Sequence, residues 1–92
     1  MSVTEETVHT RETILVAIQE ILSDMLGNVV AEKITLETDL LGAAPLHLDS
    51  IDQLEFLMSL EVVFDMDISE EESQQFSTIQ NVVEFVAKRL KV

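Results

Sequence analysis

Apolar residues recur at three- and four-residue spacing in three stretches of the chain, as they do in amphipathic helices. The pattern predicts helices over residues 4–25, 50–64 and 78–91. Glu5 and Glu6 suit the positive end of the first helix, and Gly27-Asn28 indicates its stop. The positions expected to face the core are Val8, Ile14, Leu15, Ile18, Ile21, Leu22 and Met25 in the first helix, Ile51, Leu54, Leu57 or Met58, Leu60 and Phe64 in the second, and Ile79, Val82, Val83, Val86 and Leu90 in the last.

Residues 28–49 lack sustained periodicity and predict a long loop between the first two helices. Its apolar residues are expected to hold the loop against the helices; they are Ile34, Leu36, Leu40 and Leu41. Residues 42–45, with one Gly and one Pro, are expected to be its most mobile part. A short third helix is predicted over residues 70–75.

Three sequence patterns match the capping box, in which a side chain at the helix start and another three residues later bond each other's backbone N–H groups. They are Ser50-x-x-Gln53, Ser69-x-x-Glu72 and Ser77-x-x-Gln80. Together these features predict an all-α protein, a small four-helix bundle of three main helices and one short third helix. With 92 residues, we expect residues 1–92 to form a single domain.

The acidic charge of the chain limits the kinds of molecule that it can bind. The net charge is −13, and residues 34–87 contain no Lys or Arg, so we expect no nucleic acid partner. From charge alone, the acids of this stretch form either a solvated surface or a surface for a basic partner. No apolar run approaches the roughly 18 residues of a membrane span, and the acidic N-terminus is unlike a signal peptide. We therefore expect a cytoplasmic monomer. The absence of Cys excludes a thiol nucleophile, and two His residues are too few for a typical His-rich metal site.

Ser50 stands between Asp49 and Ile51, where the long loop meets the second helix. A Ser at such a junction is usually the N-cap. If Asp49 caps the helix instead, the Ser50 hydroxyl is left free, and a phosphate ester there would face unpaired backbone N–H groups. No neighbour is placed to activate Ser50 as a nucleophile, so the sequence predicts that the protein is not an enzyme and that another protein would modify Ser50.

Four segments resemble the acyl carrier protein family: Asp39–Gly42, Leu48–Glu61 around the Asp-Ser-Ile triplet, Val63–Ser69, and Ser77–Val86. The resemblance covers about residues 12–90. It implies a 4′-phosphopantetheine arm on Ser50, installed from coenzyme A by a phosphopantetheinyl transferase. The thiol of the arm would carry acyl intermediates as thioesters for fatty acid, polyketide or related lipid biosynthesis.

The resemblance also implies that the second helix docks onto basic patches of acyl-transferring and condensing enzymes. The matching positions are the acids Asp49, Asp52, Glu55 and Glu61, with Ile51 and Met58 as apolar contacts. The chain departs from the family pattern in three places. His47 and Leu48 stand where a Gly is common, residues 43–48 lengthen the loop, and Val62 replaces a usual acid. These departures indicate a specialised carrier.

Alternative functions stay open. A peptidyl or D-alanyl carrier would use Ser50 in the same way, whereas an unmodified acidic adaptor would use Ser50 only as a helix cap. Asp65-x-Asp67-x-Ser69 begins like a calcium-binding loop, but Glu70 and Phe76 stand where that loop needs Gly and Glu. If the protein carries an acyl chain, its shelter is expected near Leu54, Leu57, Phe64, Ile68, Phe76 and Ile79.

Overall fold

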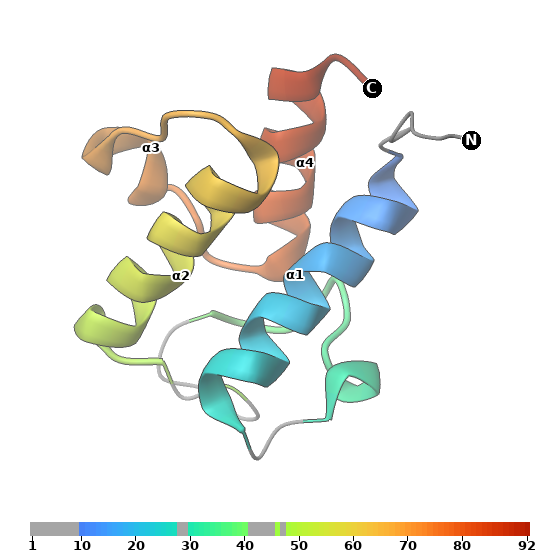
Figure 1. Cartoon of the computed structure of the whole chain (residues 1–92), viewed down its shortest axis with the longest axis vertical. Helices are drawn as coiled ribbons and strands as arrows, with labels where there is room; N and C mark the ends of the chain where they lie inside the picture. The colour runs from blue at the N-terminus through green and yellow to red at the C-terminus, as the bar shows by residue number, and fades with distance from the viewer. Residues whose placement is uncertain (1–9, 28–29, 41–45, 47) are drawn as a thin grey trace.

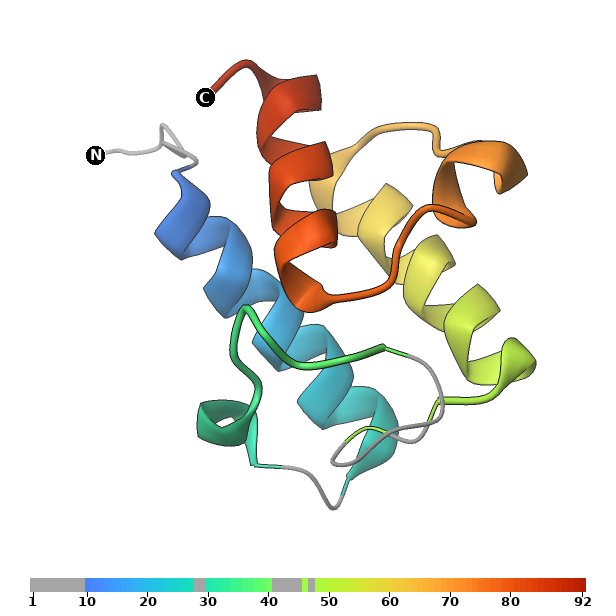
Figure 2. The same ribbon diagram turned by 180° about the vertical axis from the view of Figure 1, so that it is seen from behind.

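The computed structural model describes residues 10–27, 30–40, 46 and 48–92, and all structural statements here concern these residues. The order of elements is α1 (Arg11–Leu26), a 3-10 turn η1 (Ala31–Lys33), α2 (Ser50–Phe64), α3 (Glu70–Ser73) and α4 (Ile79–Leu90). Helix α1 packs against both α2 and α4, and the short α3 stands in the segment that connects α2 to α4, away from α1 (Figures 1 and 2). The described part of the chain is helical without a strand, so the predicted all-α class is confirmed.

Helix α1 begins later than the periodicity predicted. Thr10 is extended and caps the helix, because its hydroxyl accepts from Thr13 N–H at 3.2 Å while Thr13 Oγ1 accepts from Thr10 N–H at 2.8 Å. Glu5, Glu6 and Val8 lie outside the described residues. The predicted stop is confirmed at Gly27, whose left-handed φ of 73° ends the helix.

The long loop is held to the helices by its backbone as well as by its apolar residues. Ile34 and Leu40 are fully buried, as predicted, whereas Leu36 is 38% exposed and Leu41 lies outside the described residues together with 42–45. Leu40 N–H donates to the Ser77 carbonyl at 3.0 Å, and Ile79 N–H donates to the Thr38 carbonyl at 2.9 Å. The loop is therefore paired with the segment that starts α4, an arrangement that periodicity alone did not predict.

The predicted span of α2 is confirmed, but its predicted inward face is partly wrong. Phe56, Leu60 and Phe64 are the buried positions of α2. Ile51 and Leu54, expected in the core, are 70% and 56% exposed. The reason is that α2 carries apolar residues on most of its circumference, so its periodicity does not define one stripe, and packing decides which side is buried.

The two C-terminal helices are shorter than predicted, because α3 ends two residues earlier and α4 is capped one residue later at its start and ends at Leu90. Helix α3 ends at Ser73, and its predicted Ser69-x-x-Glu72 capping box is confirmed. Helix α4 starts after Thr78, which forms a capping box with Asn81 instead of the predicted Ser77-x-x-Gln80. The predicted inward residues of α4 are buried except Leu90, which is half-buried; the buried ones are Ile79, Val82, Val83 and Val86.

The core is one cluster that draws on every main helix and on the loop. It places α1 in the middle, through Ile14, Ile18 and Leu22, against α2 on one side and α4 on the other. Within the part of the chain described by the structure, no helix combines the length and apolar character needed to cross a bilayer.

Candidate functional site

Ser50 is the first residue of α2, and its neighbours do the capping. The Asp49 carboxylate accepts from Asp52 N–H at 2.8 Å, and the Asp52 carboxylate accepts from Asp49 N–H at 3.4 Å. The predicted Ser50-x-x-Gln53 box is therefore wrong by one residue. Asp49 is the N-cap because its extended backbone directs the carboxylate toward the N–H of Asp52. A carboxylate is also stabilised by the positive end of the helix dipole.

Because Asp49 provides the cap, the Ser50 hydroxyl is not needed to cap α2. Ser50 is exposed, and its side chain has no hydrogen-bond partner among the described residues. The interpretation of Ser50 as a mere helix cap is thus wrong for this structure. Instead, α2 presents to solvent a hydroxyl that its own fold does not use.

Buried leucines hold the start of α2 in place. Leu46 and Leu48 are each 3% exposed and belong to the core cluster, so the segment that leads into Asp49 is anchored from inside. His47 lies between them, outside the described residues. A group attached to Ser50 would therefore start from a fixed point on the surface.

The environment of Ser50 is compatible with a phosphate ester. The backbone N–H groups of Ser50 and Ile51 have no acceptor within the described part of the chain, as expected for the first turn of a helix. Asp49 and Asp52 already occupy part of the positive field of this helix end, so the dipole adds little attraction for a second anion. The fit rests on exposure and on the free hydroxyl.

A groove begins at Ser50 and runs between α2 and α3. Its volume is about 660 Å³, and it is lined by Ser50, Gln53, Leu54, Leu57, Glu70, Ser73, Gln74 and Phe76. Three of the six residues expected to shelter an acyl chain, Leu54, Leu57 and Phe76, lie in this lining. The other three, Phe64, Ile68 and Ile79, are at most 6% exposed in the core and do not line it.

Helix α3 forms one wall of this groove, and Arg89 of α4 holds it in place through hydrogen bonds. The Arg89 guanidinium donates to the Asp67 carbonyl at 2.7 Å and to Glu72 Oε2 at 2.8 Å, and it lies 4.8 Å from the centre of the Phe85 ring. The pKa of Glu72 lies below its ordinary value, first because Ser69 N–H donates to the carboxylate and also because of Arg89. Nothing local in the sequence marks this contact, since Arg89 and Glu72 lie 17 residues apart.

The predicted partner-binding residues fall into two groups. Ile51, Glu55 and Met58 form an exposed ridge along the outer side of α2, with Ile51 70% and Met58 55% exposed, and Asp49 is exposed at its start. Asp52 and Glu61 are half-buried and also serve the fold. Glu61 Oε2 accepts from Ile68 N–H at 2.9 Å and so fixes the turn between α2 and α3.

One family model and several known proteins are similar to this chain over most of its length. The family model described as "Phosphopantetheine attachment site" matches residues 16–86. A protein of Coprothermobacter proteolyticus named acyl carrier protein is 38% identical over 80 residues, which cover 87% of this chain and 94% of that protein. Proteins of the same name from Rubrobacter xylanophilus and Amoebophilus asiaticus are 38% and 39% identical over 85% and 77% of this chain, covering 93% and 85% of their own lengths.

Proposed function

The chain belongs to the acyl carrier proteins, a family with a phosphopantetheine attachment site, and we propose that its 4′-phosphopantetheine arm is attached to Ser50. The observation that carries this assignment is the division of roles at the start of α2. Asp49 and Asp52 satisfy the helix cap, so the exposed Ser50 hydroxyl is spare. The hydroxyl also lies inside the stretch that matches the family model.

The bound arm supplies a terminal thiol, on which acyl groups are carried as thioesters. The chain itself contains no Cys, so the working thiol belongs to the arm. On the protein side, Leu48 and Asp49 hold the attachment point still, and the apolar groove lined by Leu54, Leu57 and Phe76 offers a surface for part of the arm or its cargo. Acyl carrier proteins carry substrates for other enzymes, and we propose that this chain likewise catalyses no reaction.

The proposed partners are a phosphopantetheinyl transferase and acyl-transferring and condensing enzymes with basic docking patches. Support comes from the exposed ridge of Ile51, Glu55 and Met58, which starts beside Asp49 and Ser50. Carboxylates on such a ridge speed and orient encounters with a basic surface. We propose Asp52 and Glu61 as contacts of lesser weight, because their carboxylates also bond the chain's own backbone. The single domain, the monomeric state and the cytoplasmic location stay predictions.

The test is enzymatic loading in vitro. The full chain, produced in a host without a matching transferase, is incubated with coenzyme A and a promiscuous phosphopantetheinyl transferase and then analysed by intact-protein mass spectrometry. We expect one added phosphopantetheine, with the modified peptide containing Ser50. Ser50→Ala should stay unmodified, whereas Ser73→Ala, which changes another serine of the same groove, should load like the parent. Unaltered mass under conditions that load other carriers, or loading of Ser50→Ala, would refute the proposal.

A further inference from the structure

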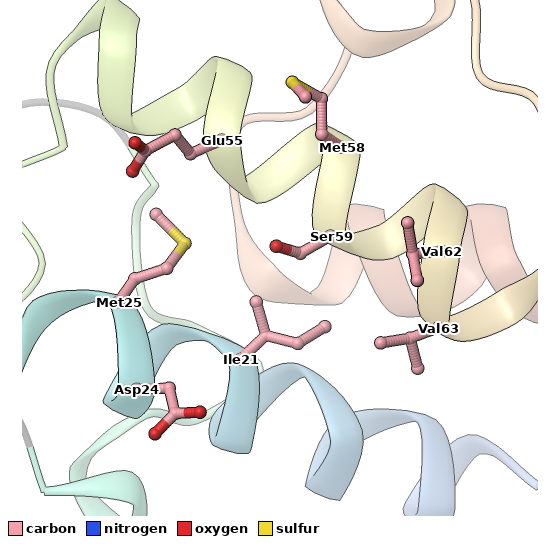
Figure 3. A pocket seen from close by; sticks show the side chains of 8 residues that line it. All are labelled: Ile21, Asp24, Met25, Glu55, Met58, Ser59, Val62 and Val63. Carbon is pink, nitrogen blue, oxygen red and sulfur yellow. The ribbon is translucent and has the colours of Figure 1, made fainter.

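A second groove lies on the opposite flank of α2, where this helix faces α1 (Figure 3). Its volume is about 660 Å³, and it is lined by Ile21, Asp24 and Met25 of α1 and by Glu55, Met58, Ser59, Val62 and Val63 of α2. In Figure 3 the side chains of Ile21 and Met25 rise from α1 toward α2. The groove shares no residue with the one at Ser50.

Three exposed apolar side chains of the described residues line this groove. Of nine large apolar side chains that are exposed, five lie on α2, and three of those five line the groove: Met58, Val62 and Val63. Val62 is 80% exposed and Val63 50%. Ile21 and Met25 are half-buried and connect the groove floor to the core cluster. Exposed apolar side chains that line one groove together offer an apolar surface that a partner can cover.

The carboxylates that line the groove favour some occupants over others. Asp24 and Glu55, both exposed, are charged residues of its lining, one on each wall, and no Lys or Arg is among the described residues that line it. In a symmetric contact between two copies, these carboxylates would be brought toward the same residues of the other copy, in chains that each carry −13. An anionic membrane surface would be repelled for the same reason. A basic protein surface is complementary to the groove.

We propose that the groove between α1 and α2 is a docking site for a partner protein that inserts an apolar side chain between Met25 and Val62 and flanks it with Lys or Arg facing Asp24 and Glu55. The site rests on the proposed function as a carrier that docks onto basic partners, since Glu55 and Met58 belong both to the proposed ridge and to this groove. It extends the ridge, because it also requires α1 and the two valines at the end of α2. Val62 lies twelve residues after Ser50, about 18 Å along the helix. A partner held here leaves the groove at Ser50 open.

The experiment uses a defined probe, an amphipathic helical peptide with a Leu stripe at i, i+3, i+4 and i+7 and Lys at its other positions. Binding to the isotope-labelled full chain is followed by NMR, with apo protein. We expect the largest shifts at Ile21, Met25, Val62 and Val63. A peptide of equal charge with Ser replacing Leu, and one with Glu replacing Lys, should each bind at least about tenfold more weakly, since each lacks one of the two required features.

Matched variants locate the contact. The double variant Val62→Gln, Val63→Gln should bind the Leu–Lys peptide about tenfold more weakly, as expected when two largely exposed valines no longer lose apolar surface to water. The control is Val16→Gln on α1, which changes a valine of 50% exposure outside the groove and should bind like the parent. Circular dichroism and urea midpoints of each variant show whether the fold is kept; Val62→Gln alone, at the most exposed position, serves if the double variant unfolds.

Four outcomes would overturn the proposal. They are equal affinity of parent and double variant, shifts confined to the Ser50 end of α2, dimerisation of the chain through this face in sedimentation, and binding of the chain to phosphatidylglycerol vesicles that competes with the peptide. Ser50→Ala should bind the peptide like the parent. The docking result is therefore independent of loading, and failure of one proposal is distinguishable from failure of the other.

Discussion

The division of roles between Asp49 and Ser50 yields a sharp stability prediction. Asp49 supplies the cap oxygen of α2 at 2.8 Å from Asp52 N–H, whereas the Ser50 side chain bonds nothing among the described residues. Removing an N-cap side chain costs about 1 kcal/mol, within a range of roughly 0.5–2. Replacing an exposed, unbonded serine by alanine within a helix changes stability by less than about 0.5 kcal/mol. Asp49→Ala should therefore be less stable than Ser50→Ala.

Urea unfolding of the apo protein measures this difference. With a slope of about 1 kcal/mol per molar urea for a chain of this size, the midpoint of Asp49→Ala should fall by about 1 M and that of Ser50→Ala by less than about 0.5 M. Asp49→Asn is the matched control, because asparagine caps as well as aspartate but lacks the charge. The urea midpoint of Asp49→Asn should stay near that of the parent. Any increase in the midpoint would come from reduced repulsion between acids in a chain of net charge −13.

The reasoning fails if Ser50→Ala loses as much stability as Asp49→Ala, since the hydroxyl would then be part of the cap. It also fails if Asp49→Ala and Asp49→Asn behave alike, because the effect would then be one of charge. Asp49→Asn also separates the role of Asp49 in capping α2 from its proposed role as a docking charge. As it keeps the cap, a slower loading by the transferase would be attributable to the lost docking charge.

Three further predictions concern the frame around the site. Gly27→Ala should destabilise by about 1 kcal/mol in urea unfolding, although no described residue other than its chain neighbours lies within 4 Å of the added methyl, because alanine is strained at φ 73°. Phe56→Ala, at a 1% exposed core position, should lose about 3–5 kcal/mol and unfold much of the protein, and a cooperative transition near the parent's midpoint would contradict the core assignment. Glu72 has a pKa below the ordinary 4.5, first because of the Ser69 N–H and then Arg89, so its contribution is complete above about pH 4.5 and is lost as the pH falls through the lower folded value. Urea midpoints should accordingly show Glu72→Gln less stable than the parent at pH 7 and equal to it in acid, and a constant gap down to pH 3 would argue against the pairing.

Local patterns in the sequence were sufficient for the helices and for the family. The predicted span of α2, residues 50–64, agrees with the structure, and the apolar repeats of the other helices gave their spans approximately, because a helix is stabilised by contacts three and four residues apart. The Asp-Ser-Ile triplet with its flanking segments indicated the carrier class, which the comparisons confirm. The Gly27 stop was also readable, since glycine is the usual residue in a left-handed helix end.

Tertiary packing decided the features on which the site depends. Which side of α2 is buried could not be read from a helix that is apolar nearly all round; packing of the core buries Phe56 and leaves Ile51 and Val62 in solvent. Cap choice between adjacent candidates depends on the backbone angles of the incoming loop, which is extended at Asp49 and follows the buried Leu48. The fastening of α3 by Arg89 and the two grooves flanking α2 arise only when segments distant in sequence meet, and local periodicity carries no information about such meetings.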